Sequence, residues 1–182
     1  MTREHDLDDI VALLARTPSA LEALLRDLPE TLTHRNEGEN TWSAFQIVAH
    51  LIQAETSNWI TRTKWLLEFG ETKAFEPFVR QPDEGKISGK SLAQILGEFA
   101  WLRSENLDAL RALNLKPSDL EKRGLHPTLG TVRLGELLAT WAAHDLTHLH
   151  QLTRVMACQY RESVGPFRRY LGVMRCDGHS EP

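Results

Sequence analysis

The sequence has little of three things that would narrow its class at once: cysteine, excess charge and long apolar runs. Only two of its 182 residues are cysteine, which excludes a disulfide framework and predicts a reducing, cytoplasmic compartment. Its 21 basic and 25 acidic residues leave a net charge of −4, so a nucleic-acid-binding face is not expected. No apolar run reaches the roughly 18 residues of a membrane span, and the N-terminus lacks a signal peptide's apolar core. We therefore expect one soluble domain over residues 1–182.

What the sequence does contain is a helical pattern, divided by glycine, proline and polar residues. Apolar residues recur at steps of three and four, which is typical of amphipathic helices. The segments with this spacing are 6–28, 43–69, 91–113 and 134–158. Pro18 is expected to kink or break the first segment, and Ser43 to cap the second. The pattern predicts an all-α four-helix bundle.

The segments between these helices are long and irregular. Residues 71–90 and 116–132 contain several prolines and glycines and predict crossover connections, and no strand-length alternating segment competes with the helices. A short helical piece is expected within 164–174, followed by a frayed tail over 175–182. Crossovers of this length in compact domains are often functional.

Eight histidines stand out in this composition, and two of them share a helix face. His144 and His148 are four residues apart, so they lie about 40° apart around the helix and about 6 Å along it. Both belong to the apolar stripe that includes Trp141 and Leu152, which should face the core. Imidazoles buried there need hydrogen-bond partners or a metal ion.

His50 supplies a third candidate ligand, from the predicted helix over 43–69. Its stripe also contains Ile47 and Ala54 and therefore faces the interior. Two ligands from one helix and one from another are a common way for a bundle to build a site. Three neutral imidazoles would leave a divalent ion near +2 with open positions, which is typical of a catalytic centre. Buried histidines held by hydrogen bonds alone remain the alternative.

The remaining histidines and the cysteines are weaker candidates. His150 should point to another helix face, His126 lies in a connector where it can line a pocket, and Cys158 is about 15 Å along the helix from His148. Solvated positions are expected for three others in loops or termini: His5, His34 and His179.

The acidic residues nearest the three histidines argue against two known metal sites. Asp145 replaces the glutamate of the His-Glu-x-x-His protease pattern and points about 100° away from His144. No histidine follows a glutamate by three residues, which excludes a di-iron bundle. Glu55 is expected to bind between helices, and Asp145 to orient an imidazole or bind a neighbouring helix. Five tryptophans are expected to be core or interface anchors: Trp42, Trp59, Trp65, Trp101 and Trp141.

Several short motifs resemble the DinB/YfiT-like metal-binding superfamily of bacteria, whose members are DNA-damage-inducible proteins and not the polymerase of that name. The motifs are Trp42-Ser43, His50-Leu51 with Glu55, Trp59 with Arg62, His144-Asp145-Leu146-Thr147-His148-Leu149-His150-Gln151, and the tail Val164-Gly165-Pro166-Phe167-Arg168-Arg169-Tyr170-Leu171. Their order and separation are similar to the family's over nearly the whole chain, from the first helix to about residue 174.

The resemblance implies a four-helix bundle, commonly a homodimer, with a divalent metal on His50, His144 and His148. Characterised members use low-molecular-weight thiols, as in bacillithiol transferases and a mycothiol-dependent maleylpyruvate isomerase. We therefore expect a metal-dependent enzyme acting on a small molecule, in which Zn²⁺, Ni²⁺, Fe²⁺ or Mn²⁺ activates a thiolate or water. The reaction expected first is thiol-dependent transfer or isomerisation, and metal-dependent hydrolysis is an alternative. A second alternative is a stress-related bundle that binds a metal or small ligand without catalysis. A third alternative is a helical interaction protein with structural histidines.

Overall fold

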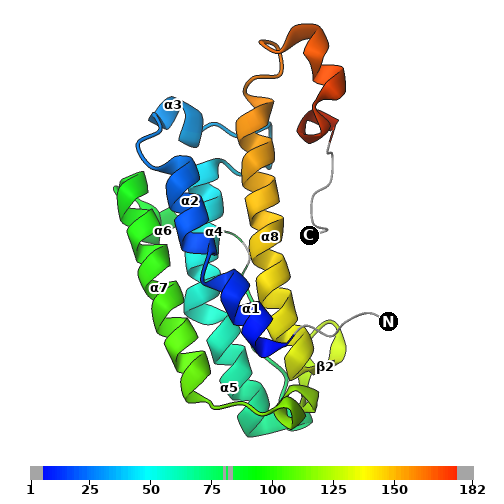
Figure 1. Ribbon diagram of the computed structural model, residues 1–182. Coiled ribbons are helices and arrows are strands. Elements are labelled where there is room, and N and C mark those ends of the chain that lie inside the picture. Colours follow the sequence, from blue (N-terminus) through cyan, green and yellow to red (C-terminus); the bar gives the residue numbers. More distant parts are fainter. Residues whose placement is uncertain (1–5, 80, 82–83, 176–182) are drawn as a thin grey trace.

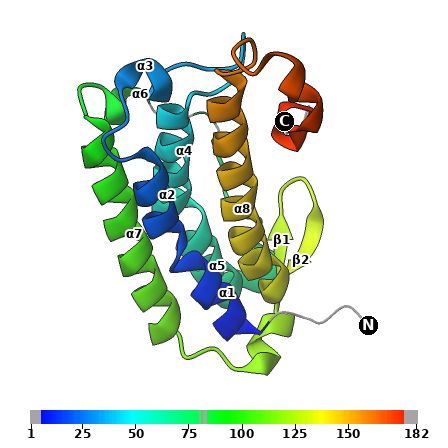
Figure 2. The same cartoon turned by 45° about the horizontal axis from the view of Figure 1, so that its top comes forward.

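Four helical segments run side by side in the computed structural model, which describes residues 6–79, 81 and 84–175 (Figure 1). They are α1 (Leu7–Leu14) with α2 (Thr17–Leu25), α4 (Ala44–Ser57) with α5 (Trp59–Phe69), α7 (Leu92–Ala112), and α8 (Leu134–Cys158). The same segments lie side by side in the second view (Figure 2). Contacts join α4 to α7 and α8, α1 to α8, and α2 to α7. The predicted all-α four-helix bundle with long crossovers is confirmed.

Two of the predicted helices are each divided by a short interruption. The first breaks at Ala15 and Arg16, so Pro18 falls in the first turn of α2, where its missing N–H costs no hydrogen bond. The predicted single helix over 43–69 is interrupted at Asn58, whose ψ of −71° departs from helical geometry. Hydrogen bonds from the Asn58 N–H and to its carbonyl hold α4 and α5 together as one segment (Figure 1). Ser43 caps α4 as predicted, because its hydroxyl accepts from the Gln46 N–H at 3.3 Å.

The connections between the long helices and the segment after α8 contain short elements of regular structure. They are α3 (Glu30–Thr33), η1 (Gly70–Thr72), α6 (Glu84–Ile87), η2 (Pro117–Glu121), β1 (Arg123–His126), β2 (Gly130–Arg133), η3 (Gly165–Tyr170) and η4 (Gly172–Arg175), where η denotes a 3₁₀ helix. The tail expected to form one helical piece therefore forms two 3₁₀ turns. Two positions to which solvated histidines were assigned, 5 and 179, lie outside the described residues, as do residues 176–182 of the expected frayed tail.

The expectation that no strand occurs was wrong, because the second connector folds into an antiparallel hairpin of β1 and β2. Each strand has only four residues, too few to show an alternating pattern. The hairpin packs on α5 through Gly124, where an added Cβ would meet Leu66 Cγ at 2.8 Å. It also binds the other crossover, since the Phe75 N–H donates to the Leu125 carbonyl at 2.9 Å. The hairpin therefore fixes both crossovers at one end of the bundle.

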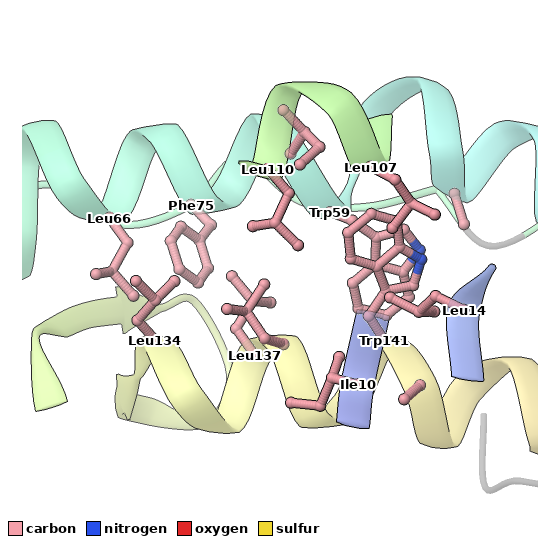
Figure 3. Packing of buried hydrophobic residues seen from close by; sticks show 14 residues of the cluster. Ile10, Leu14, Trp59, Leu66, Phe75, Leu107, Leu110, Leu134, Leu137 and Trp141 are labelled. Atoms are coloured by element: carbon pink, nitrogen blue, oxygen red, sulfur yellow. The ribbon is translucent and has the colours of Figure 1, made fainter. Parts of the chain in front are cut away.

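The core fills the space between the helices in two clusters. Figure 3 shows the cluster that joins α1, α5, α7 and α8, in which the rings of Trp59 and Trp141 stack at 5.8 Å. The other cluster lies between α2, α4, α7 and the C-terminal half of α8 and includes Phe45, Phe99 and Leu152. Burying such side chains stabilises the fold by about 1.5–3 kcal/mol each relative to exposure. Buried polar side chains, among them His50, Arg103 and His148, interrupt these apolar clusters.

Candidate metal centre

The three candidate ligands lie on the core-facing sides of α4 and α8, as their spacing predicted. His50 is 3 % exposed, between the fully buried Ile47 and Ala54 on the same helix face. His148 is 8 % exposed, and His144, one turn earlier, is partly buried. Because α4 and α8 pack against each other, imidazoles from both helices enter the same space.

The ε nitrogens of these histidines converge on one another. The Nε2 atom of His144 lies 3.2 Å from that of His50 and 3.1 Å from that of His148. One nitrogen from each of the three rings lies within 4.8 Å of the others, so the three could hold one ion together. The structure therefore brings together all three residues chosen from the helix faces; we call them the histidine triad.

The neighbour of His148 determines which of its nitrogens faces the triad. Its Nδ1 lies 2.8 Å from Oε1 of Gln151, an amide oxygen that can only accept, so the Nδ1–H donates. In the neutral ring the Nε2 lone pair then points toward His144. Burial lowers the pKa of His148, an effect opposed by the Gln151 hydrogen bond and the charge of Asp145. A neutral imidazole with its lone pair directed inward is the form that binds a metal ion.

Aromatic rings surround the triad. Trp42 lies against His50, with ring centroids 4.7 Å apart, and also stacks near His148 at 6.2 Å. The edge of His144 meets Trp59 at 5.0 Å, and Phe78 of the first crossover meets His50 at 5.9 Å. Trp42 was predicted to be a core or interface anchor, and Phe78 was not predicted at this site. This apolar enclosure lowers the local dielectric constant and strengthens any charge interaction within it.

A buried ionic network lies beside the triad and was not anticipated from the sequence. Its centre is Arg103 of α7, which is 1 % exposed. The guanidinium forms two hydrogen bonds with the Asp145 carboxylate, at 2.6 and 2.9 Å, and a third with Glu55 at 2.8 Å. A fourth goes to the Leu14 carbonyl at 2.8 Å. Despite this burial the pKa of Arg103 is raised, because the two carboxylates outweigh its desolvation.

Further donors complete the network around the two carboxylates. The Thr17 hydroxyl donates to Asp145 at 2.5 Å, and the Trp141 indole donates to Glu55 at 2.9 Å. Asn106 donates to the second Glu55 oxygen, also at 2.9 Å. Glu55 and Asp145 therefore bind other helices and are not part of the triad, which agrees with the interhelical role expected for Glu55. One guanidinium against two carboxylates leaves a net formal charge of −1 in the core.

One sequence signal could have revealed the network. Position 103 falls between Phe99 and Leu107 at steps of four, on the apolar stripe of its helix. A charged side chain on a core stripe requires a buried partner of opposite charge. The long helices offer two acidic residues on neighbouring interior faces, Glu55 and Asp145.

The other sequence candidates lie apart from the triad. His150 is exposed, His34 stacks on Phe45 at 4.6 Å, and Cys158 is partly buried at the end of α8. His126 belongs to β1, where its Nδ1 accepts two backbone N–H groups of the turn that follows and its ring meets Phe75 edge-on. Trp101 is 61 % exposed and is therefore not a core residue.

None of the described helices combines the length and apolarity required to cross a membrane. This agrees with the absence of long apolar runs in the sequence.

A family model described as the DinB superfamily matches residues 13–152, which include α4, α7, most of α8 and all three triad histidines. No curated protein matches the sequence.

Two solved structures share the fold. One is YfiT from Bacillus subtilis, described as a probable metal-dependent hydrolase with an unusual four-helix bundle topology. It is 19% identical, the match covers 90% of each chain, and the TM-score is 0.70. The other is TT2238, described as a four-helix bundle protein, with 19% identity and a TM-score of 0.52 over 84% of this chain and 99% of that one. At these identities the likeness concerns the fold.

Proposed function

Because the chain belongs to the DinB superfamily, we propose that it is a metal-dependent enzyme that activates a thiol or a water molecule against a small electrophilic substrate. The observation that supports the proposal is the convergence of three Nε2 atoms from His50, His144 and His148. We propose these residues as the ligands of one divalent cation.

The distances within the triad fit a cation better than a hydrogen-bonded cluster. Ligand nitrogens about 2.05 Å from a tetrahedral zinc ion lie about 3.3 Å apart, close to the 3.1 and 3.2 Å between the triad nitrogens. His148 directs a lone pair toward His144 Nε2, and His50 Nε2 also lies close to this atom. His144 Nε2 carries at most one proton, so it can donate a linear hydrogen bond to only one of these two nitrogens. A cation accepts a lone pair from each ring. Ligation by three imidazoles is compatible with Zn²⁺, Ni²⁺, Fe²⁺ or Mn²⁺. The availability of these metals in the cell decides which of them is bound.

The chain's own residues would hold the ligands and exclude solvent. Gln151 fixes the tautomer of His148 by accepting its Nδ1–H. Trp42, Trp59 and Phe78 cover the imidazoles and keep the site apolar. When bound, a divalent cation supplies Lewis acidity, which lowers the pKa of a thiol or water ligand toward neutrality. Since the three ligands are uncharged, the positive charge is not cancelled and favours an anionic nucleophile or substrate.

Thiol transfer is the first reaction that we propose. The thiol proton passes to solvent, the sulfur forms a bond to an electrophilic carbon of the substrate, and the leaving group departs with the bonding pair. A low-molecular-weight thiol is the expected cosubstrate, on the basis of the motifs shared with the family. Hydrolysis, with water in place of the thiol, is the second candidate, and the description of YfiT as a probable metal-dependent hydrolase favours it.

Metal analysis of the purified protein is the first test. We expect about one divalent ion per chain in the wild type and strong loss in His50→Ala and His148→Ala. His150→Ala is the matched control, because His150 is exposed on the same helix as His148. A wild type that stays metal-free after incubation with each of the four ions would refute the proposal.

An assay for turnover distinguishes a metal-dependent enzyme from a non-catalytic binding protein. Metal-loaded protein is assayed with a panel of cellular thiols and an aryl halide, and separately with a chromogenic ester. Activity with the thiols that is lost in His50→Ala supports transfer, whereas ester cleavage with the same dependence supports hydrolysis. A metal-dependent rise in melting temperature without turnover in either assay would support the non-catalytic alternative.

A further inference from the structure

A cavity of about 260 Å³ lies between α4, α5 and the crossover segment 75–79. Its walls include the aromatic side chains of Trp65, Phe75 and Phe78. This volume lies just below the range of about 300–1,000 Å³ that is typical of small-molecule pockets. It is therefore large enough for a small organic molecule with an aromatic or aliphatic body.

The cavity adjoins the histidine triad. Phe78 lines the cavity and also meets His50 edge-on at 5.9 Å. Gln53, another lining residue, follows His50 by three residues on α4 and so lies about one turn further along the same helix. Gln53 donates to the Val79 carbonyl at 2.6 Å, which ties the crossover wall to α4. The triad histidines are not among the lining residues, so a molecule in the cavity is separated from His50 by the Phe78 ring.

Arg62 supplies a positive charge to the wall of this cavity. Arg62 is partly buried, and burial lowers its pKa. Its guanidinium donates to the Glu76 carbonyl at 3.0 Å and lies over the Phe75 ring at 5.2 Å. No carboxylate among the residues that the structure describes forms an ion pair with it. The two buried arginines Arg103 and Arg154 differ, because each forms an ion pair with at least one carboxylate.

A guanidinium in this position is suited to a carboxylate. It carries five N–H donors, one of which is used by the Glu76 carbonyl, so a two-pronged contact with a carboxylate remains possible. The exposed Glu76 side chain also borders the cavity. Its negative charge disfavours a ligand with a second carboxylate.

From this geometry we propose that the cavity binds a small monocarboxylic acid with an apolar body. The carboxylate contacts Arg62, and the body packs against Trp65 and Phe78, beside the triad. The inference rests on the proposed function in one respect: the acid is the substrate, or part of the substrate, of the metal centre. Its binding is measurable without turnover.

The test is calorimetric titration of the full chain with 3-phenylpropionate, its neutral amide, and the dicarboxylate phenylmalonate. We expect the acid to bind about tenfold more tightly than the amide, because the Arg62 contact is a charge-assisted, two-pronged hydrogen bond. We expect a similar preference over the dicarboxylate, because Glu76 repels the second carboxylate. Arg62→Met should reduce acid binding to the level of the amide. Arg62→Lys keeps the charge but loses the fork and should give an intermediate affinity.

Lys64→Met is the matched control, because Lys64 is exposed on the same helix and its loss changes the net charge equally. Circular dichroism establishes that each variant is folded. Equal affinity for acid and amide, no binding of any probe, or unchanged binding in folded Arg62→Met would overturn the inference. Acid binding that depends on Arg62 in a protein that binds no metal would refute the proposed function and leave this site standing. Metal binding without acid binding would do the reverse.

Discussion

Replacing Arg103 by methionine is the perturbation for which the structure gives the clearest expectation. The guanidinium is almost fully buried and donates four hydrogen bonds, three of them to the carboxylates of Asp145 and Glu55. Those carboxylates are 0% and 4% exposed as residues, so water cannot replace the lost donors without opening the core. Methionine keeps much of the apolar volume and a similar helix propensity, so that the main loss is the charge and its hydrogen bonds.

The magnitude follows from leaving two negative charges buried without a counter-charge. Removing one partner of a buried ion pair typically costs about 3–5 kcal/mol, and here the partner is shared by two carboxylates. Thr17, Trp141 and Asn106 still donate to them, which limits the loss. We therefore expect the free energy of unfolding to fall by about 3–4 kcal/mol, a large part of the 5–15 kcal/mol typical of a domain.

Urea denaturation followed by circular dichroism measures this difference. With a slope of about 2 kcal/mol per molar urea, the midpoint should fall by about 1.5–2 M. The control is Arg111→Met on the same helix, whose ion pair with Asp108 is exposed, with side chains 56% and 66% accessible. That variant should change stability by no more than about 0.5 kcal/mol. Equal midpoints for the two variants would refute the assignment of Arg103 to a buried, obligatory network.

Three smaller predictions test other parts of the fold by thermal or urea denaturation. Gly124→Ala should destabilise the protein by about 1–3 kcal/mol because the new Cβ meets Leu66. Gly97→Ala, at a position of α7 where an added Cβ meets no other atom, should stabilise it by up to about 1 kcal/mol. The opposite order would contradict the packing of the hairpin on α5. Ser43→Ala should cost about 1 kcal/mol through loss of the α4 cap, and no loss would mean that this cap is dispensable. Burial and then the charge of Arg62 lower the pKa of His126 below 6.5, so the unfolded chain binds this proton more readily than the folded protein. The contribution of neutral His126 to the free energy of unfolding should therefore be fully present above about pH 6.5 and should fall as the pH falls below it. His126→Gln should flatten the plot of urea midpoint against pH in this range. An unchanged slope would exclude His126 as the source of the pH dependence.

The helices and the triad were accessible from the sequence because both depend on local periodicity. Apolar steps of three and four located every long helix, and the same arithmetic placed His144 and His148 on one interior face. His50 required only that a second stripe be recognised as interior. Interruptions such as Asn58 escaped prediction, since a single residue with an unusual ψ leaves the surrounding pattern unchanged.

The crossovers and the ionic network were not accessible in the same way. The wall of the cavity is held by contacts between distant segments, such as the Trp65 indole with the Lys73 carbonyl and Phe75 with Leu125. No periodicity in residues 71–90 encodes these contacts. Arg103 was overlooked because a charged residue is normally exposed, although its position on an apolar stripe was visible.

The network and the triad are connected through the two helices that carry both. On α8 the adjacent residues His144 and Asp145 point about 100° apart, one toward the triad and the other toward Arg103. On α4, His50 likewise points toward the triad and Glu55 toward Arg103. An apolar interface tolerates a slip of one turn, but such a slip would move Asp145 by about 5.4 Å and break both of its bonds to Arg103. The buried charges therefore fix the rotation and register of α4 and α8, and with them the meeting point of the three imidazoles.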